Sequence, residues 1–138
     1  GNPKLIIVDE PTAGLDPVER TRFHNLLSEI GENTVVILST HIVDDVSNLC
    51  TQMAIINNGA VVLKGTPEAA LTTIKDKIWN KVIDKNELGQ LQAHYQVLTT
   101  RLVGGKPTAF IYSEAVPGAG FSPCEGGLEE VYFHAIYQ

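Results

Sequence analysis

The chain has 138 residues, of which 43% are hydrophobic, and a formal net charge of -6. This length allows one hydrophobic core and a small second unit, and the acidic balance argues against nucleic acid held mainly through clustered Lys and Arg. Cys50 and Cys124 stand far apart with no C-x-x-C spacing, which argues against a zinc site or a disulfide framework. No apolar stretch reaches the ~20 residues of a membrane span, and no charged-then-apolar leader is present.

The first part of the chain has the pattern of a parallel sheet. Residues 4–9 and 34–39 are near-continuous apolar runs, which are typical of strands covered on both faces. Between them we expect a helix with Asp16 as N-cap, Pro17 first, Glu19 as capping-box partner and Gly31 at the end. Its buried face is expected to hold Phe23, Leu26, Leu27 and Ile30. Strand, helix and strand in this order form a crossover unit.

Three further elements follow before the character of the sequence changes. A second helix is expected to turn Val43, Val46, Leu49 and Cys50 inward. Asn57-Asn58-Gly59 between apolar residues 53–56 and 60–64 predicts a hairpin, and Thr66-Pro67-Glu68 predicts another helix start. Beyond residue 75 the pattern becomes amphipathic, so we place a domain boundary there, between residues 1–75 and 76–138.

The second part has a β-α-β-β pattern. We expect a strand at 78–83, a short helix with Asp84 and Glu87 as its capping box, and strands at 97–103 and 108–113 around Gly104-Gly105. Residues 116–127 are rich in Pro and Gly and predict an irregular connection. A last helix from Leu128 is expected to bury one face and to leave Glu129 and Glu130 in solvent. The side chains expected on that buried face are Leu128, Val131, Tyr132, Ala135 and Ile136.

Two motifs carry a family resemblance. Residues 6–17 read IIVDEPTAGLDP, and Ser39-Thr40-His41 follows the second apolar run. In order and spacing they resemble the Walker B motif, D-loop and H-loop of ATP-binding cassette (ABC) ATPases. The sequence contains neither a G-x-x-x-x-G-K-[ST] phosphate loop nor an LSGGQ-type signature, and in this family both lie upstream of Walker B. The chain therefore resembles the C-terminal piece of a longer ATPase, and alone it is expected to be catalytically inert.

The resemblance implies roles for two adjacent carboxylates at the end of the first strand. Asp9 would serve the Mg²⁺ that accompanies ATP, and Glu10 would be the general base that activates a water. Side chains alternate along a strand, so the two point in different directions, and Pro11 favours an extended Glu10. A bare Asp-Glu pair more often only ends a strand with solvated charges, but the complete string favours the functional interpretation.

The resemblance also assigns His41 and Asp16. One ring nitrogen of His41 would donate to the terminal phosphate of ATP while a backbone group holds the other. Asp16 stands in the D-loop, which in the family crosses the interface between two nucleotide-binding domains; its role as a helix N-cap is compatible with that. His24, His94 and His134 have no such context and are interpreted as surface or packing residues.

The sequence thus predicts an α/β fold: a partial P-loop NTPase sheet of the ABC type with a small α+β C-terminal extension. The extension resembles that of ABC-2-type export ATPases, with either a packing or a regulatory role. The implied partners are a second nucleotide-binding domain and a transmembrane permease subunit, with a cytoplasmic location peripheral to the membrane. The alternatives are an ABC-type DNA-repair or translation factor and a non-enzymatic binding module. Because the strand at residues 35–39 would lack a neighbour, we also expect self-association through an exposed sheet edge or exchange of elements between chains. The alternative is that the C-terminal extension folds into the gap.

Overall fold

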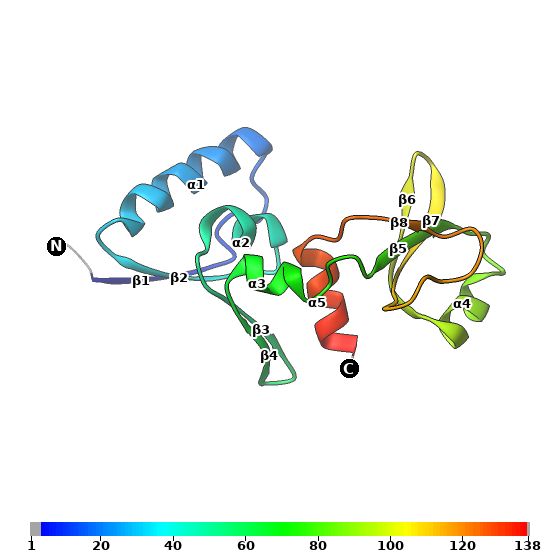
Figure 1. Cartoon of the computed structure of the whole chain (residues 1–138). Coiled ribbons are helices and arrows are strands. Elements are labelled where there is room, and N and C mark those ends of the chain that lie inside the picture. The colour runs from blue at the N-terminus through cyan, green and yellow to red at the C-terminus, as the bar shows by residue number, and fades with distance from the viewer. Residues whose placement is uncertain (1–3, 138) are drawn as a thin grey trace. The chain divides into compact units, whose positions relative to one another are not determined.

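The computed structural model describes residues 4–137, apart from the side chain of residue 44, and divides into two compact units, residues 1–53 and 54–138 (Figure 1). The domain boundary that we place at residue 75 rests on a change of sequence character and stays a prediction. Residues 1–3 of the first predicted domain and residue 138 of the second lie outside the described residues. Within residues 4–137, no helix has the length and apolar character needed to cross a membrane.

The first unit is a strand-helix-strand crossover followed by a short helix. Strands β1 (Leu5–Asp9) and β2 (Val35–Ser39) pair in parallel, from Leu5 opposite Val35 to Asp9 opposite Ser39. Helix α1 (Pro17–Gly31) connects them, and α2 (Val43–Leu49) follows β2. The Asp16 side chain accepts a hydrogen bond of 2.8 Å from the Glu19 backbone N–H, so the predicted N-cap of α1 is confirmed.

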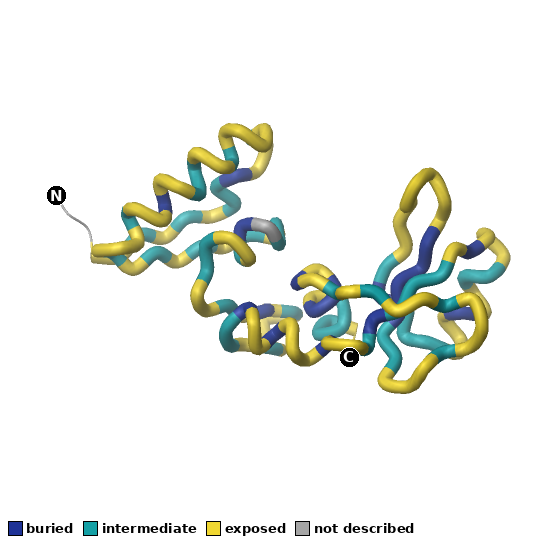
Figure 2. Tube along the Cα trace, turned by 45° about the horizontal axis from the view of Figure 1, so that its top comes forward, coloured by how far each residue is buried: buried dark blue, intermediate teal, exposed yellow. Residues whose placement is uncertain are grey.

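The two-stranded sheet is covered on one face only within the described residues. Along both strands exposed and half-buried residues alternate, as the colours of the tube in Figure 2 show. Ile7 is 68% exposed and Val35 63% exposed, while Ile6 and Val36 are half-buried. The expected cover on both faces is therefore wrong for these residues, and so is the expected burial of Leu26, which is 51% exposed. An apolar run in the sequence indicates that a strand tends to be buried on both faces. The side chains that would bury the second face of this sheet are not among those described.

The second unit begins with a hairpin and a short helix. Strands β3 (Met53–Asn57) and β4 (Ala60–Gly65) pair around a turn in which Asn58 and Gly59 have positive φ angles of 52° and 76°. Two positive φ angles are what the tight Asn-Gly hairpin turn requires, so the predicted hairpin is confirmed. Helix α3 (Pro67–Thr72) starts where predicted, with the Thr66 hydroxyl accepting from the Ala69 N–H at 3.1 Å.

A four-stranded antiparallel sheet forms the rest of the second unit. Its order is β6-β7-β5-β8, with β5 (Ile78–Val82), β6 (Gln96–Val103), β7 (Lys106–Tyr112) and the short β8 (Ser122–Pro123). Helix α4 (Leu88–His94) links β5 to β6, and α5 (Leu128–Tyr137) ends the unit (Figure 1). The β-α-β-β pattern is confirmed; β8 lies in the segment predicted to be irregular.

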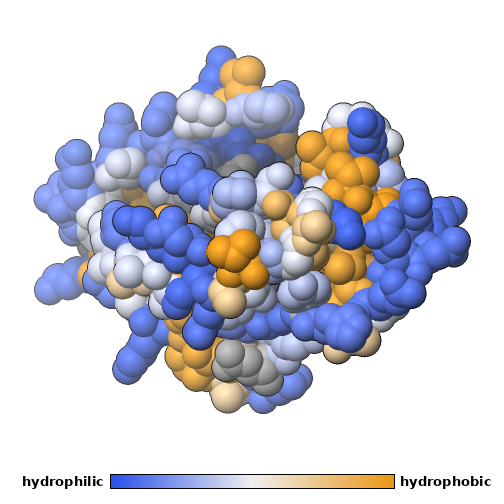
Figure 3. Space-filling view, turned by 45° about the vertical axis from the view of Figure 1, so that its right-hand side comes forward, coloured by the Kyte–Doolittle hydropathy of each residue, from blue (hydrophilic) through white to orange (hydrophobic). Residues whose placement is uncertain are grey.

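The core of this unit is apolar, and three predictions for its helices need correction. Its most buried large side chains are Ile74, Ile78, Ile111 and Val131. Helix α4 begins at Leu88, later than expected, although the Asp84 N–H does donate to Glu87 Oε1 at 3.3 Å, as in the predicted capping box. Glu130, predicted in solvent, is only 6% exposed and accepts a 2.9 Å bond from the Gly127 N–H. Tyr132, predicted to be buried, is 40% exposed. The face of the protein in Figure 3 shows apolar side chains reaching the surface between hydrophilic ones.

Candidate functional site

The backbone changes direction at Glu10, where β1 ends. Its N–H donates to the Ser39 carbonyl at 2.7 Å, which extends the contact between the strands by one residue. Its φ angle is 48°, so the extended conformation predicted from Pro11 is wrong. A non-glycine residue at positive φ costs about 1–3 kcal/mol and persists where surrounding contacts hold it, often at functional sites. The contacts that hold Glu10 come from the residues after β2.

The carboxylate of Glu10 is bonded to the loop that follows β2. Its Oε1 accepts from the His41 backbone N–H at 3.0 Å and lies 2.8 Å from His41 Nδ1, and its Oε2 accepts from the Thr40 hydroxyl at 3.4 Å. The hydrogen bond from the His41 side chain holds the pKa of Glu10 below its ordinary value, although partial burial acts in the opposite direction. Glu10 is therefore an ionised hydrogen-bond acceptor at neutral pH.

The His41 ring joins Glu10 on one side and is open on the other. We predicted that a backbone group would hold one ring nitrogen; instead, the Glu10 carboxylate does. The side chain is 79% exposed, and within residues 4–137 no partner is bonded to Nε2. With the Nδ1 proton donated to the carboxylate, Nε2 can donate to a phosphate oxygen only when the ring is protonated.

Asp9 and Asp16 are not joined to the Glu10–His41 pair by any described contact. Asp9 is exposed at the end of β1, and its carboxylate has no bond to the residues that the structure describes. Those residues contain no group of three His, Cys, Asp or Glu side chains able to hold a metal. Mg²⁺ commonly keeps several waters and takes one or two carboxylates together with substrate phosphates, so a lone exposed carboxylate is compatible with it. Asp16 caps α1.

A buried polar network lies beside the pair, and sequence reasoning missed it. Thr12 and Asp45 are both 0% exposed. Asp45 Oδ2 accepts from the Thr12 hydroxyl at 2.6 Å and from the Thr40 hydroxyl at 3.4 Å, and its Oδ1 lies 2.7 Å from His24 Nε2. The His24 side chain is 12% exposed and bonded to Asp45, so of the two predicted roles the surface one is wrong and the packing one fits. Thr40 is bonded to both Glu10 and Asp45 and so links the pair to the network.

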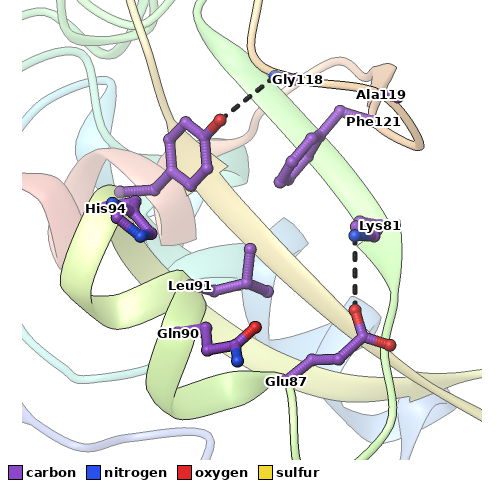
Figure 4. A pocket seen from close by; sticks show the side chains of 9 residues that line it. Lys81, Glu87, Gln90, Leu91, His94, Gly118, Ala119 and Phe121 are labelled. Carbon is purple, nitrogen blue, oxygen red and sulfur yellow. Dashed lines mark hydrogen bonds and ion pairs between the residues drawn. The ribbon is translucent and has the colours of Figure 1, made fainter.

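A separate pocket of about 200 Å³ lies in the second unit (Figure 4). Tyr95 and Phe121 line it with their rings 5.2 Å apart, and the Tyr95 hydroxyl accepts from the Gly118 N–H at 3.1 Å. Lys81 Nζ lies 3.3 Å from Glu87 Oε2, so the two charged groups at its wall pair with each other. No unpaired charge indicates a ligand in this pocket, and the end of β1 is the stronger candidate site.

Comparisons with known proteins agree with the motifs. No family model matches the chain. The chain is 39% identical over 79 residues to an energy-coupling factor transporter ATP-binding protein of Clostridioides difficile (strain 630), a match covering 56% of this chain and 27% of that protein. It is 40% identical over 65 residues to ABC transporter A family member 8 of Dictyostelium discoideum, which covers 47% of this chain and 8% of that protein.

A solved ATP-binding subunit of an ABC transporter aligns with 52% of this chain and 30% of its own, with 33% identity and a TM-score of 0.47. The curated homologues are ABC transporter ATP-binding proteins, which confirms the resemblance seen in the motifs. The chain spans at most 27% of the length of these two curated relatives.

Proposed function

We propose that this chain supplies the carboxylate and histidine part of a Mg-ATP-hydrolysing site in an ABC transporter ATP-binding protein. The observation that carries the proposal is the contact between Glu10, at the end of β1, and His41, after β2, at 2.8 Å. The two residues that the motifs assign to catalysis thus meet at the carboxyl ends of two parallel strands. Nucleotide sites form at this edge of open α/β sheets. The names of the relatives support the same activity.

Each of the three side chains has a distinct task in this proposal. Glu10 is ionised and accepts the proton of the attacking water while it keeps its contact with His41. Nε2 of a protonated His41 donates to the terminal phosphate and stabilises the charge that develops there. Asp9 would hold the Mg²⁺ that accompanies ATP, and the metal would supply charge neutralisation to the phosphate oxygens. The phosphate loop that cradles the triphosphate comes from residues that this sequence does not contain.

The decisive test is Glu10→Gln in a complete ATPase that contains this chain. The amide keeps the shape of the side chain but cannot accept the proton, so the turnover of ATP should fall by ~10²–10⁴ while ATP binding stays nearly intact. Glu29→Gln, an exposed change of the same chemistry on α1, is the matched control. Turnover of the Glu10→Gln variant within a factor of about three of the wild type would remove Glu10 from the role of base.

A second test concerns the metal. Asp9→Asn removes the charge that attracts Mg²⁺ and should weaken the part of ATP binding that depends on the metal. Titration of ATP with and without Mg²⁺, in the wild type and in the variant, measures that part. If the wild type binds ATP equally well in both conditions, Asp9 has no metal role.

The partners belong to the same proposal. Asp16, in the turn before α1, would lie against a second nucleotide-binding domain, and the dimer would drive a transmembrane permease subunit from the cytoplasmic face of the membrane. Residues 76–138 would act as an extension of the ABC-2 exporter type, with domain limits at residue 75. Co-purification of the complete protein with membranes that contain its permease tests this arrangement.

Self-association is proposed for the chain as it stands. Among the described strands β2 pairs with β1 alone, and Val35 and Ile37 are 63% and 50% exposed. An apolar strand with a free edge recruits strands from other molecules. Light scattering over a dilution series should show a dimer or larger species that dissociates on dilution, and Ile37→Lys should weaken it. A strict monomer at every concentration would contradict the proposal.

A further inference from the structure

Asp45 is buried at the point where three segments of the first unit meet. Its carboxylate is 0% exposed and bonds Thr12 from the turn after β1, His24 from α1 and Thr40 from the loop after β2. A buried carboxylate is costly unless several donors satisfy it, and here the donors come from three different elements. The side chain therefore fixes these elements relative to one another within the unit.

The hydroxyl of Thr40 connects this buried carboxylate to the candidate base. It lies 3.4 Å from Glu10 Oε2 and 3.4 Å from Asp45 Oδ2, and it accepts from the Ile42 backbone N–H at 2.9 Å. A hydroxyl has one proton to donate, so two carboxylates share a single donor here. The two distances are equal, so the Thr40 hydroxyl lies between the carboxylates of Asp45 and Glu10 and is held by both.

We propose that Asp45 is a positioning residue that acts through Thr40 to hold His41 against Glu10. This inference rests on the proposed function, because Glu10 and His41 are the pair whose geometry it sets. His41 follows Thr40 directly, so the orientation of Thr40 fixes where the His41 N–H and ring meet the Glu10 carboxylate. Neither Walker B nor the H-loop includes Asp45, and the motifs give it no role.

The first experiment uses the 138-residue chain and needs no ATPase activity. The His41 amide donates to Glu10, so its hydrogen-exchange rate reports the contact. By NMR, Thr40→Val, which removes the hydroxyl, should speed that exchange about fivefold or more. Thr40→Ser, which keeps the hydroxyl, should restore slow exchange, and Glu29→Gln should change nothing. A merely structural role would not separate the Val and Ser variants.

A double-mutant cycle then asks whether Asp45 acts through Thr40. Asp45→Asn should also speed exchange of the His41 amide, and the Asp45→Asn/Thr40→Val double variant should add little to either single change. If Asp45→Asn does not fold, Thr12→Val takes its place, because it removes a donor to the same carboxylate without changing side-chain volume greatly. Effects that multiply, or a His41 exchange rate within about twofold of wild type, would overturn the proposal.

The kinetic test separates this inference from the proposed function. In a complete ATPase, Asp45→Asn should lower kcat about 10-fold to 100-fold, as the loss of supporting contacts does elsewhere, and leave KM for ATP nearly unchanged. Glu10→Gln is measured beside it. If Glu10→Gln leaves turnover intact, the proposed function fails; if Glu10→Gln abolishes turnover and Asp45→Asn does not lower it, only the positioning role fails.

Discussion

The two units of the chain differ in what they bury. Residues 54–138 enclose an apolar core whose most buried members include Ile74, Ile78, Ile111 and Val131. In residues 4–53, Leu27 is the only apolar side chain in the buried class, and the side chains buried most completely are Thr12 and Asp45. The second unit is thus organised by hydrophobic contacts, and the first by polar bonds around one carboxylate.

This difference has an energetic consequence. Full burial of an Ile or Val side chain contributes about 1.5–3 kcal/mol, whereas a typical hydrogen bond contributes only about 0.5–1.5 kcal/mol net because water is a good alternative partner. A two-stranded sheet with one uncovered face has little else to stabilise it. We infer that the unit that carries the candidate site is the less stable of the two.

Separating the units should have the largest effect. Residues 54–138 expressed alone should keep a single cooperative unfolding transition in denaturant, because their core is complete. Residues 1–53 expressed alone should show no cooperative transition. A cooperative transition of similar steepness from residues 1–53 would contradict the inferred difference in stability between the units. It would show that the polar network and α1 are enough to fold the first unit.

A matched pair of substitutions sharpens the same contrast. Ile111 in β7 is 0% exposed, and Ile37 in β2 is 50% exposed. Ile111→Ala should lower the free energy of unfolding of its unit by about 2–5 kcal/mol, since it leaves a cavity, and Ile37→Ala should change stability by less than about 1 kcal/mol. Chemical denaturation of both variants measures the difference. Equal losses would mean that the exposed face of β2 is covered in solution.

The sequence predicted the elements well where local signals set them. The Asn-Gly turn places the β3–β4 hairpin, and Asp16 places the start of α1, because both act through residues that are close in sequence. The sequence predictions failed where contacts with residues distant in the sequence determine whether a side chain is buried. Glu130 is buried because Arg101, 29 residues away, lies 3.4 Å from its Oε1, and the Gly127 N–H bonds its Oε2.

The candidate site was predicted in part for the same reason. Its motifs identify Glu10 and His41, and the structure brings these two together. No local pattern points to Asp45, whose partners Thr12 and His24 lie 33 and 21 residues away in the sequence. The positive φ of Glu10 also escaped prediction, because the preference imposed by Pro11 is weaker than the combined contacts with Ser39, Thr40 and His41.

A smaller effect is expected at the start of α1. Asp16→Ala removes the side-chain oxygen that accepts from the Glu19 N–H and should destabilise the first unit by about 1 kcal/mol. Asp16→Asn keeps an acceptor and should retain most of that stability. Hydrogen exchange of the Glu19 amide in the whole chain reports the cap directly. Equal exchange rates in the Ala variant and the wild type would show that the cap does not stabilise the unit.

The smallest effect concerns pH and the second unit. His134 stacks on Tyr112 with ring centroids 3.9 Å apart, and burial, aided by the charge of Lys77, holds the pKa of His134 below its ordinary value of 6.5. The folded state therefore binds this proton less readily than the unfolded chain, so the stabilisation is present above the ordinary pKa and is lost as pH falls below it.

Unfolding of residues 54–138 should become easier between pH 7 and pH 5 in the wild type. His134→Phe keeps an aromatic ring against Tyr112 but cannot titrate, so its stability should depend less on pH over the same window. Identical pH dependence in both proteins would show that His134 contributes nothing to it.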